Sequence, residues 1–208
     1  MENTLNTSVG EYSLAQFPDS CHICLIYDSE EQRQKIVAEY LAQGIRKGEV
    51  VSYFTDKTDG ETVRSWLTEQ DIELTESEGM NKFNLAKAEN AYCPDGSFQP
   101  EKMIERSLNR YRMAKEAGFC GSRASGEMSW ALKGLPGSER ILEYESMLNA
   151  FECDFPHSGM CQYDARLFDG ATLLKILQVH PFIIAQGQVV QNPYYIKHDE
   201  FHSLLSTH

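Results

Sequence analysis

Two cysteines in CxxC spacing, with a histidine between them, first indicate chemistry in this chain; they lie in DSCHICLIYDSEE, residues 19–31. Thiolate sulfur and imidazole nitrogen are ligands that Zn²⁺ prefers, and a CxxC that begins a helix is a common thiol–disulfide pair. Residues 22–27 are instead predicted to form a strand, on which side chains alternate between the two faces. Cys21 and Cys24 therefore point in opposite directions and cannot hold one metal ion together, whereas His22 and Cys24 share a face.

A metal or thiol site consequently needs ligands from elsewhere in the chain. Cys161, on another predicted strand, and His180 are the candidates, and a nitrogen–sulfur site would then consist of His22, Cys24, Cys161 and His180. Free cysteines are also among the residues most often buried in ordinary cores. Plain packing is therefore the first interpretation, with no cofactor expected. A metal- or thiol-dependent redox switch or enzyme is the alternative.

The segment after residues 22–27 lies where a nucleotide-binding protein would carry its phosphate-binding loop. It reads DSEEQRQK, with no glycine to present backbone N–H groups and no GK[ST] to supply a lysine and a magnesium-binding hydroxyl. No GxGxxG fingerprint and no GxSxG nucleophile elbow occur elsewhere in the chain. In the absence of a complete catalytic motif, we expect a protein that is not an enzyme.

Two charged residues fall on a strand that is predicted to be interior. Glu127 ends it in ASGEMSW, beside Trp130, where α/β sheets expose functional residues; a carboxylate that caps a loop is the alternative. Arg123 lies within the strand and needs an acidic partner, because an unpaired interior charge is costly. The candidate partners are Glu127, Asp28, Glu30 and Glu31.

Charge and hydropathy limit the partners that this chain could bind. Its 31 acidic and 19 basic residues give a net charge of −12, which would repel nucleic acid and anionic membranes. No apolar run approaches the roughly 18 residues that cross a bilayer. The first residues lack the basic start and apolar centre of a signal peptide, so we expect a cytoplasmic protein without a disulfide framework.

Strands and helices are predicted to alternate along the chain. The expected strands are 22–27, 49–55, 82–86, 119–125 and 158–164, with a closing hairpin at 182–185 and 188–191. The expected helices are 29–48, 60–69, 99–117, 138–151 and 169–179. This order predicts a three-layer α/β domain with a mainly parallel sheet and helices on both faces. We expect one domain at 20–195, a mobile segment at 1–19 and a tail at 196–208.

Several segments, taken in order, resemble one known family. These are CHICLIYDSEEQ, YLAQGIRKGEVVSYFTD, SGEMSWALKGLPG, LEYESMLN, CQYDARLF and HPFIIAQGQVVQNPYY. They are similar to the MEDS domain, the sensory domain of methanogen and methylotroph regulators of the DcmR type, over about residues 20–195. YLAQGIRKGEVVSYFTD also resembles the helix and strand after the phosphate loop of KaiC-like proteins. The resemblance implies a RecA/KaiC-like fold that has lost its phosphate loop.

The resemblance to the MEDS family also implies a function. It predicts a non-enzymatic sensory domain that binds a small organic ligand, such as a simple hydrocarbon derivative or a C1 compound. The signal would pass to a protein partner, a regulator or kinase, or through a homo-oligomer. A KaiC-like assembly scaffold with residual nucleotide binding is a further alternative. The positions carried over as ligand-binding candidates are His22, Tyr27, Glu127, Trp130, Cys161, Tyr163 and His180.

Overall fold

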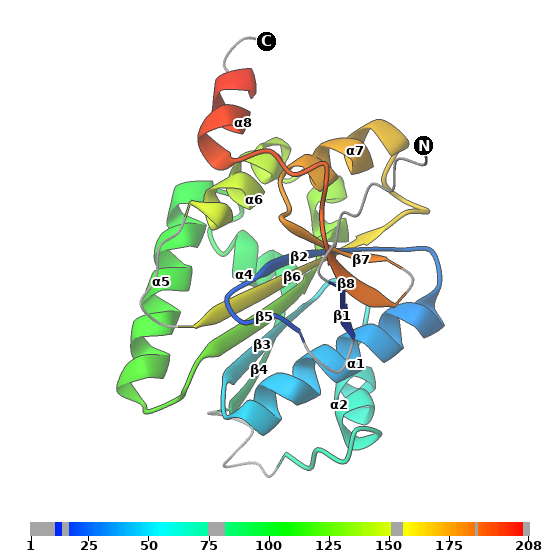
Figure 1. Ribbon diagram of the computed structural model, residues 1–208. Helices are drawn as coiled ribbons and strands as arrows, with labels where there is room; N and C mark the ends of the chain where they lie inside the picture. Colours follow the sequence, from blue (N-terminus) through cyan, green and yellow to red (C-terminus); the bar gives the residue numbers. More distant parts are fainter. Residues whose placement is uncertain (1–10, 14–16, 75–81, 151–155, 186, 206–208) are drawn as a thin grey trace, which may run out of the picture.

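The computed structural model describes residues 11–13, 17–74, 82–150, 156–185 and 187–205, and strands and helices alternate along most of them (Figure 1). The strands are β1 (Glu11–Ser13), β2 (His22–Tyr27), β3 (Val50–Thr55), β4 (Phe83–Lys87), β5 (Ser122–Glu127), β6 (His157–Asp164), β7 (Phe182–Ala185) and β8 (Gln188–Gln191). The helices are α1 (Glu30–Lys47), α2 (Gly60–Thr68), α4 (Ala88–Tyr92), α5 (Pro100–Glu116), α6 (Ile141–Asn149), α7 (Gly170–Gln178) and α8 (His198–Leu205). Two 3₁₀ helices, η1 (Met128–Lys133) and η2 (Ser138–Arg140), lie between β5 and α6.

The described strands form one eight-stranded sheet in the order β1-β8-β7-β2-β6-β5-β3-β4. Six neighbouring strands, from β7 to β4, run parallel, and β8 and β1 are added antiparallel at one edge. The helical crossovers between parallel strands place helices on both faces of the sheet. The predicted three-layer α/β fold and its closing β7–β8 hairpin are therefore confirmed.

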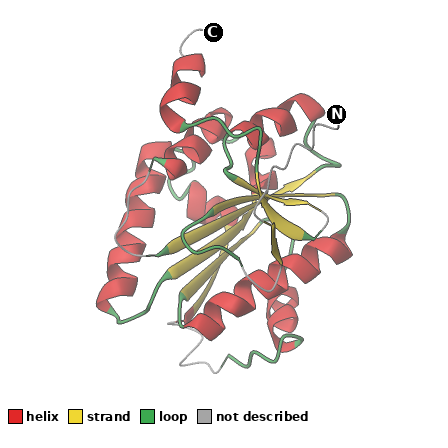
Figure 2. Cartoon of the chain, in the orientation of Figure 1, coloured by secondary structure: helices red, strands yellow, loops and turns green. Residues whose placement is uncertain are grey.

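The two faces of the sheet have separate cores, because side chains alternate along each strand. Ile23 and Leu25 pack under α1 and α2 on the first face, which we call the α1 face. Cys24 and Cys161 belong to the core under α4, α5, α6 and α7 on the second, the α5 face. Figure 2 shows these helix layers in red around the yellow sheet. None of the helices in the described ranges has the length and apolar character that a membrane span requires.

Helix α1 begins and ends as its sequence predicts. The Ser29 side chain accepts a hydrogen bond from the Gln32 backbone N–H, and Gly48 ends the helix in the left-handed conformation, at φ 81°. Gly44 has a different role inside the helix. A Cβ atom at this position would lie 2.8 Å from Val51 and 2.9 Å from Arg123, so only glycine allows α1 to approach the sheet this closely.

Arg123 is fully buried on the α1 face and is neutralised by Glu49, just before β3. Its Nε and Nη2 donate to the Glu49 carboxylate at 2.6 and 3.2 Å, and Nη1 donates to the Tyr40 carbonyl at 2.9 Å. The guanidinium also lies 4.6 Å from the Tyr40 ring centroid. The need for an acidic partner was predicted correctly. The predicted partners, Glu127, Asp28, Glu30 and Glu31, were wrong, because these acids lie at the carboxyl end of the sheet.

The two ends of the described chain both pack on the domain. Glu11–Ser13, within the segment predicted to be mobile, forms β1 and pairs with β8. Phe17 is buried against Tyr40. In the predicted tail, α8 lies against α6, where His198 Nδ1 and Ser146 Oγ are 2.9 Å apart and Phe201 is buried. Both segments thus extend the domain beyond residues 20–195.

Removing Glu49 is expected to destabilise the fold strongly. Glu49→Ala leaves a buried guanidinium without its counter-charge, which costs about 3–5 kcal/mol of unfolding free energy. Glu101→Ala, which breaks an exposed pair with Arg140, should cost at most about 1 kcal/mol. Urea unfolding of both variants measures the difference. Equal losses would contradict the role given to the Glu49–Arg123 pair.

Candidate functional site

The seven ligand-binding candidates do not surround one pocket but lie in three places. Tyr27 ends β2 and Glu127 ends β5, both at the carboxyl edge of the sheet. Four candidates meet on the α5 face of the sheet: His22, Cys161, Tyr163 and His180. Trp130 is fully buried in η1, where its ring stacks on Tyr92 at 4.8 Å. Each place has a different chemistry.

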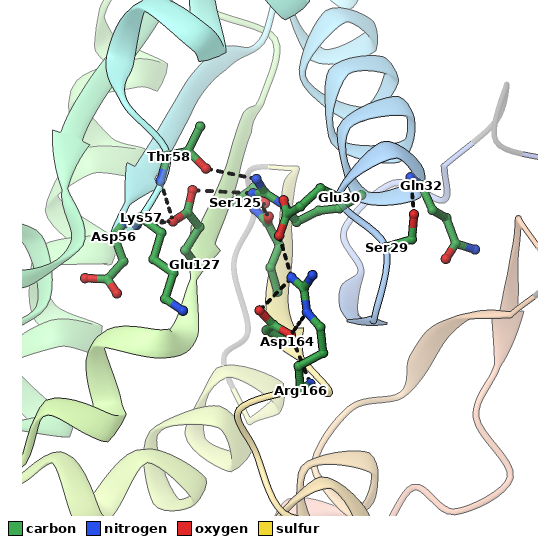
Figure 3. Close-up of polar contacts among 12 residues, drawn as sticks. Ser29, Glu30, Gln32, Asp56, Lys57, Thr58, Ser125, Glu127, Asp164 and Arg166 are labelled. Carbon is green, nitrogen blue, oxygen red and sulfur yellow. Dashed lines mark hydrogen bonds and ion pairs between the residues drawn. The ribbon is translucent and has the colours of Figure 1, made fainter.

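Glu127 organises the carboxyl edge of the sheet (Figure 3). Its Oε2 accepts hydrogen bonds from the backbone N–H groups of residues 56, 57 and 58, at 2.9, 2.6 and 3.2 Å. Its Oε1 accepts from Tyr53 Oη at 3.0 Å and from Arg33 Nη1 at 3.4 Å. The carboxylate thus holds the loop after β3 and neutralises Arg33, which is itself buried.

This environment keeps Glu127 ionised. Burial is the largest single influence and would raise the pKa of the carboxyl, but the hydrogen bonds from Thr58, Lys57 and Asp56, together with Arg33, outweigh it. The pKa of Glu127 is therefore below its ordinary value. A carboxylate held so firmly by five donors is suited to fixing a loop, and it has little capacity left to bind a ligand.

The start of α1 is occupied by side chains where a phosphate loop would otherwise expose N–H groups. Ser29 caps the helix, and Glu30 pairs with Arg33 and Arg166 at 2.7 Å each. Arg166 also donates to Asp164 at 2.8 Å. Figure 3 shows Glu30, Arg166 and Asp164 beside one another at this edge. Acidic side chains at a helix start would repel a nucleotide phosphate.

Four buried side chains converge on the α5 face of the sheet. We call them the His–Cys–Glu cluster: His22, Glu145, Cys161 and His180. Glu145 Oε2 lies 3.0 Å from His22 Nε2, 3.5 Å from His180 Nε2 and 3.3 Å from Cys161 Sγ. Cys161 Sγ is also 3.5 Å from His22 Nε2. One potential ligand atom from each residue lies within 4.8 Å of all the others.

The sequence predicted three members of this cluster and missed the fourth. Cys24 is buried on the same sheet face, opposite Cys161 in register, but is not one of the four that converge. Glu145 takes the expected place of Cys24. A signal for Glu145 is present in α6, because this acid lies in an apolar stripe with Ile141, Tyr144 and Leu148 at helical spacing.

The protonation of the cluster follows from its burial. Burial and, second, the imidazole of His180 lower the pKa of His22, against the opposing effects of Glu145 and Asn149. Burial and the Glu145 carboxylate raise the pKa of the Cys161 thiol well above its usual range. Without a further cation, the cluster therefore combines a neutral His22 with a protonated thiol. Tyr163 supports it by donating its hydroxyl hydrogen to Glu145 Oε1.

A large pocket lies between the sheet and α5, with a volume of about 750 Å³. It exists because the strands present small residues to α5, which leaves space that longer side chains would fill. These residues are Ser52, Ala86, Ser122, Ala124, Gly126 and Gly159. Ala124 stays only half-buried although its strand is interior, since the pocket opens over it.

The pocket wall is mainly apolar, with polar groups gathered on a few side chains. Phe54, Tyr92 and Met103 supply apolar surface, and Cys161 links the wall to the His–Cys–Glu cluster. His157 contacts Ser122 Oγ at 2.8 Å, and burial, followed by Arg110, lowers its pKa to about 3. The His157 imidazole is therefore uncharged around pH 7. Of the seven sequence candidates, only Cys161 lines this pocket.

Comparison with known proteins gives one family match and one curated relative. The MEDS family model, described as the methanogen/methylotroph DcmR sensory domain, matches residues 21–181. The transcriptional repressor DcmR of Methylorubrum extorquens is 25% identical over 183 residues. The alignment covers 86% of this chain but 64% of that repressor, so the chain spans less than two thirds of its relative.

Solved structures share the fold at low sequence identity. A KaiC-like protein of Pyrococcus horikoshii has a TM-score of 0.55 at 14% identity, over 84% of this chain and 79% of its own. A second Pyrococcus horikoshii protein, solved with an unknown peptide, reaches 0.63 at 10% identity, covering 89% and 91%. The flagellar accessory protein FlaH of Methanocaldococcus jannaschii gives 0.55 at 8%, covering 86% and 80%. The KaiC/RecA-like fold is thereby confirmed.

The ionised state of Glu127 should make stability depend on pH. Its native pKa is below the ordinary 4.5. Its contribution is therefore complete above about pH 4.5 and is lost as the pH falls through the lower native value. Glu127→Gln should lose about 1–3 kcal/mol at neutral pH, because an amide N–H₂ faces backbone donors. The difference in unfolding free energy between Glu127→Gln and wild type should become smaller in acid.

Urea unfolding across this pH range tests the expectation. Glu105→Gln, on the exposed side of α5, is the matched control and should follow the wild-type curve. A gap between wild type and Glu127→Gln that is unchanged by acid would contradict the ionised assignment.

Proposed function

Since this chain belongs to the MEDS family of sensory domains, we propose that it senses a small, mainly apolar organic molecule bound in the pocket beneath α5. It passes the signal to a protein partner and is not an enzyme. The pocket itself is the observation that carries the proposal. Ligand sites are typically concave, mostly apolar and about 300–1,000 Å³ in volume, and the 750 Å³ pocket falls within this range.

The distribution of polar groups indicates how a ligand would lie. The sheet side of the pocket is built from small and aromatic residues, whereas Arg110 and Ser107 stand on α5. Arg110 Nη2 donates to Ser107 Oγ at 3.2 Å, and its guanidinium lies 5.2 Å from the Phe54 ring centroid. The ligand therefore places its apolar part on the sheet and an acceptor or anionic group near Arg110.

The pocket volume also bears on ligand size. A one-carbon compound fills only a small part of 750 Å³ and buries little apolar surface, so it gains little binding free energy. A hydrocarbon derivative with a chain of several carbons matches the space better. We therefore favour simple hydrocarbon derivatives over C1 compounds as the ligand class.

Helix α6 supplies a route from the pocket to a partner. Tyr144 and Leu148 line the pocket, and Ser146 contacts His198 of α8. Packed helices respond to a filled cavity by small rigid shifts, which alter the surface they present. A regulator, a kinase or a second copy of this chain would read such a shift at α8 and its surroundings.

Filling the pocket by mutation should abolish ligand binding without unfolding the domain. Ala124→Leu adds a larger side chain where Ala124 borders empty space. Alkyl alcohols, amines, halides and carboxylates of one to about eight carbons are the probes, read by thermal shift and calorimetry. Wild-type protein should bind the longer members, carboxylates best, and Ala124→Leu should bind none.

The control is Ala171→Leu, the same exchange at an exposed position on α7. It should bind as wild type does. Failure of every probe to bind wild-type protein, or equal binding by Ala124→Leu, would refute the proposed site.

A further inference from the structure

We propose that the His–Cys–Glu cluster binds a single divalent transition-metal ion of the Zn²⁺ class, through the side chains of His22, Glu145, Cys161 and His180. The proposal does not depend on the organic ligand, because it rests on the geometry of the four donor atoms, of which only Cys161 also lines the pocket. Two imidazoles, a thiolate and a carboxylate form a donor set typical of zinc.

The spacing of the donor atoms fits one tetrahedral ion. Zinc–ligand bonds of about 2.0–2.3 Å separate the donor atoms of a tetrahedral site by roughly 3.3–3.8 Å. The separations around Glu145 Oε2 are 3.0, 3.3 and 3.5 Å, and Cys161 Sγ lies 3.5 Å from His22 Nε2. All four donor atoms lie within 4.8 Å of one another, so shifts of up to about 1 Å would complete the coordination.

Hydrogen bonds outside the cluster direct both imidazoles toward its centre. His180 Nδ1 donates to the Ile176 carbonyl at 2.7 Å. His22 Nδ1 is 3.0 Å from Asn149 Oδ1, and this oxygen must accept, because Asn149 Nδ2 already donates to two backbone carbonyls. Each Nδ1 therefore carries a hydrogen, which leaves each Nε2 as the nitrogen available to a metal ion, as in metal-bound histidines.

The surroundings of His180 Nε2 supply a carboxylate, which can only accept a hydrogen bond. His180 Nε2 is fully buried and has no hydrogen-bond partner among the described residues, although it is aimed at the Glu145 carboxylate. Buried polar atoms almost always have partners, so such an atom requires an explanation. A cation between Nε2, Oε2 and Sγ satisfies all of these acceptors at once. It also balances the buried carboxylate.

The remaining carboxylate oxygen completes the outer support. Glu145 Oε1 accepts the Tyr163 hydroxyl hydrogen, which leaves Oε2 for the ion. Hydrogen bonds that fix the orientation of a metal ligand are a general feature of metal sites. Cys161 borders the large pocket and His22 borders a smaller one of about 210 Å³, so the ion has routes of entry from solvent.

Metal analysis of the full chain, purified without chelators and after reconstitution with Zn²⁺, tests the proposal. Wild-type protein should hold one Zn²⁺ per chain, and Cys161→Ser should lose stoichiometric binding. Cys24→Ser is the matched control, since Cys24 is equally buried and adjacent in register but lies outside the cluster. Sub-stoichiometric Zn²⁺ in wild type, or loss in Cys24→Ser with retention in Cys161→Ser, would overturn the assignment.

Co²⁺ provides a readout that does not depend on a mutant folding. Added to metal-free wild-type protein, it should produce the charge-transfer absorption of a cobalt–thiolate bond, with intense visible bands from tetrahedral geometry. Absence of the thiolate band would remove Cys161 from the ligand set and overturn the proposal as stated.

The outer contact gives a graded prediction. Tyr163→Phe deletes only the hydroxyl that holds Glu145 Oε1, so it should weaken Zn²⁺ affinity by about 10–100-fold while preserving one ion per chain. Competition with a chromogenic chelator measures the change. Unaltered affinity, in a variant whose thermal unfolding matches wild type, would show that Tyr163 does not position the carboxylate for a metal.

Discussion

Buried carboxylates set the strongest constraint on this structure, because an acid removed from water needs a compensating positive charge or several donors. Among the described residues, three of the four buried acids face a guanidinium, in the pairs Glu49–Arg123, Glu127–Arg33 and Asp164–Arg166. Each pair ties a strand to a loop or helix. Glu145 is the exception, since imidazole nitrogens and a thiol surround it. The difference separates three structural charge pairs from the centre that we propose as a cation site.

The elements of this fold could be predicted from sequence because their signals are local. Helix caps, alternating strands and the hairpin glycine all act over a few residues. Partner choice is not local. The position of Arg123 within a strand predicts that it needs an acidic partner. That partner, Glu49, lies 74 residues away in the sequence, and the contact depends on how α1 packs on the sheet and where β3 begins. A residue's requirement can thus be predicted where its partner cannot.

The site was predictable to the extent that strand geometry determined it. Alternation placed His22 and Cys24 on a common face, and the structure confirms this, with Cys161 beside both. Glu145 escaped prediction because an acid on an amphipathic helix is usually solvated. The pocket was not predicted for another reason. The small residues that line it, such as Ala124 and Gly159, belong to different strands, and only the pairing of β5 with β6 brings them together.

Consecutive residues of α6 have three different surroundings. Tyr144 borders the pocket, Glu145 enters the cluster, and Ser146 contacts α8. A rigid helix cannot adjust one of these positions independently, since neighbouring residues share its axis. A ligand in the pocket and an ion in the cluster would therefore both act on the position of α8 through α6. On the two proposed sites, one short helix would combine the occupancy of the pocket and of the cluster into a single position of α8, as a coincidence detector does.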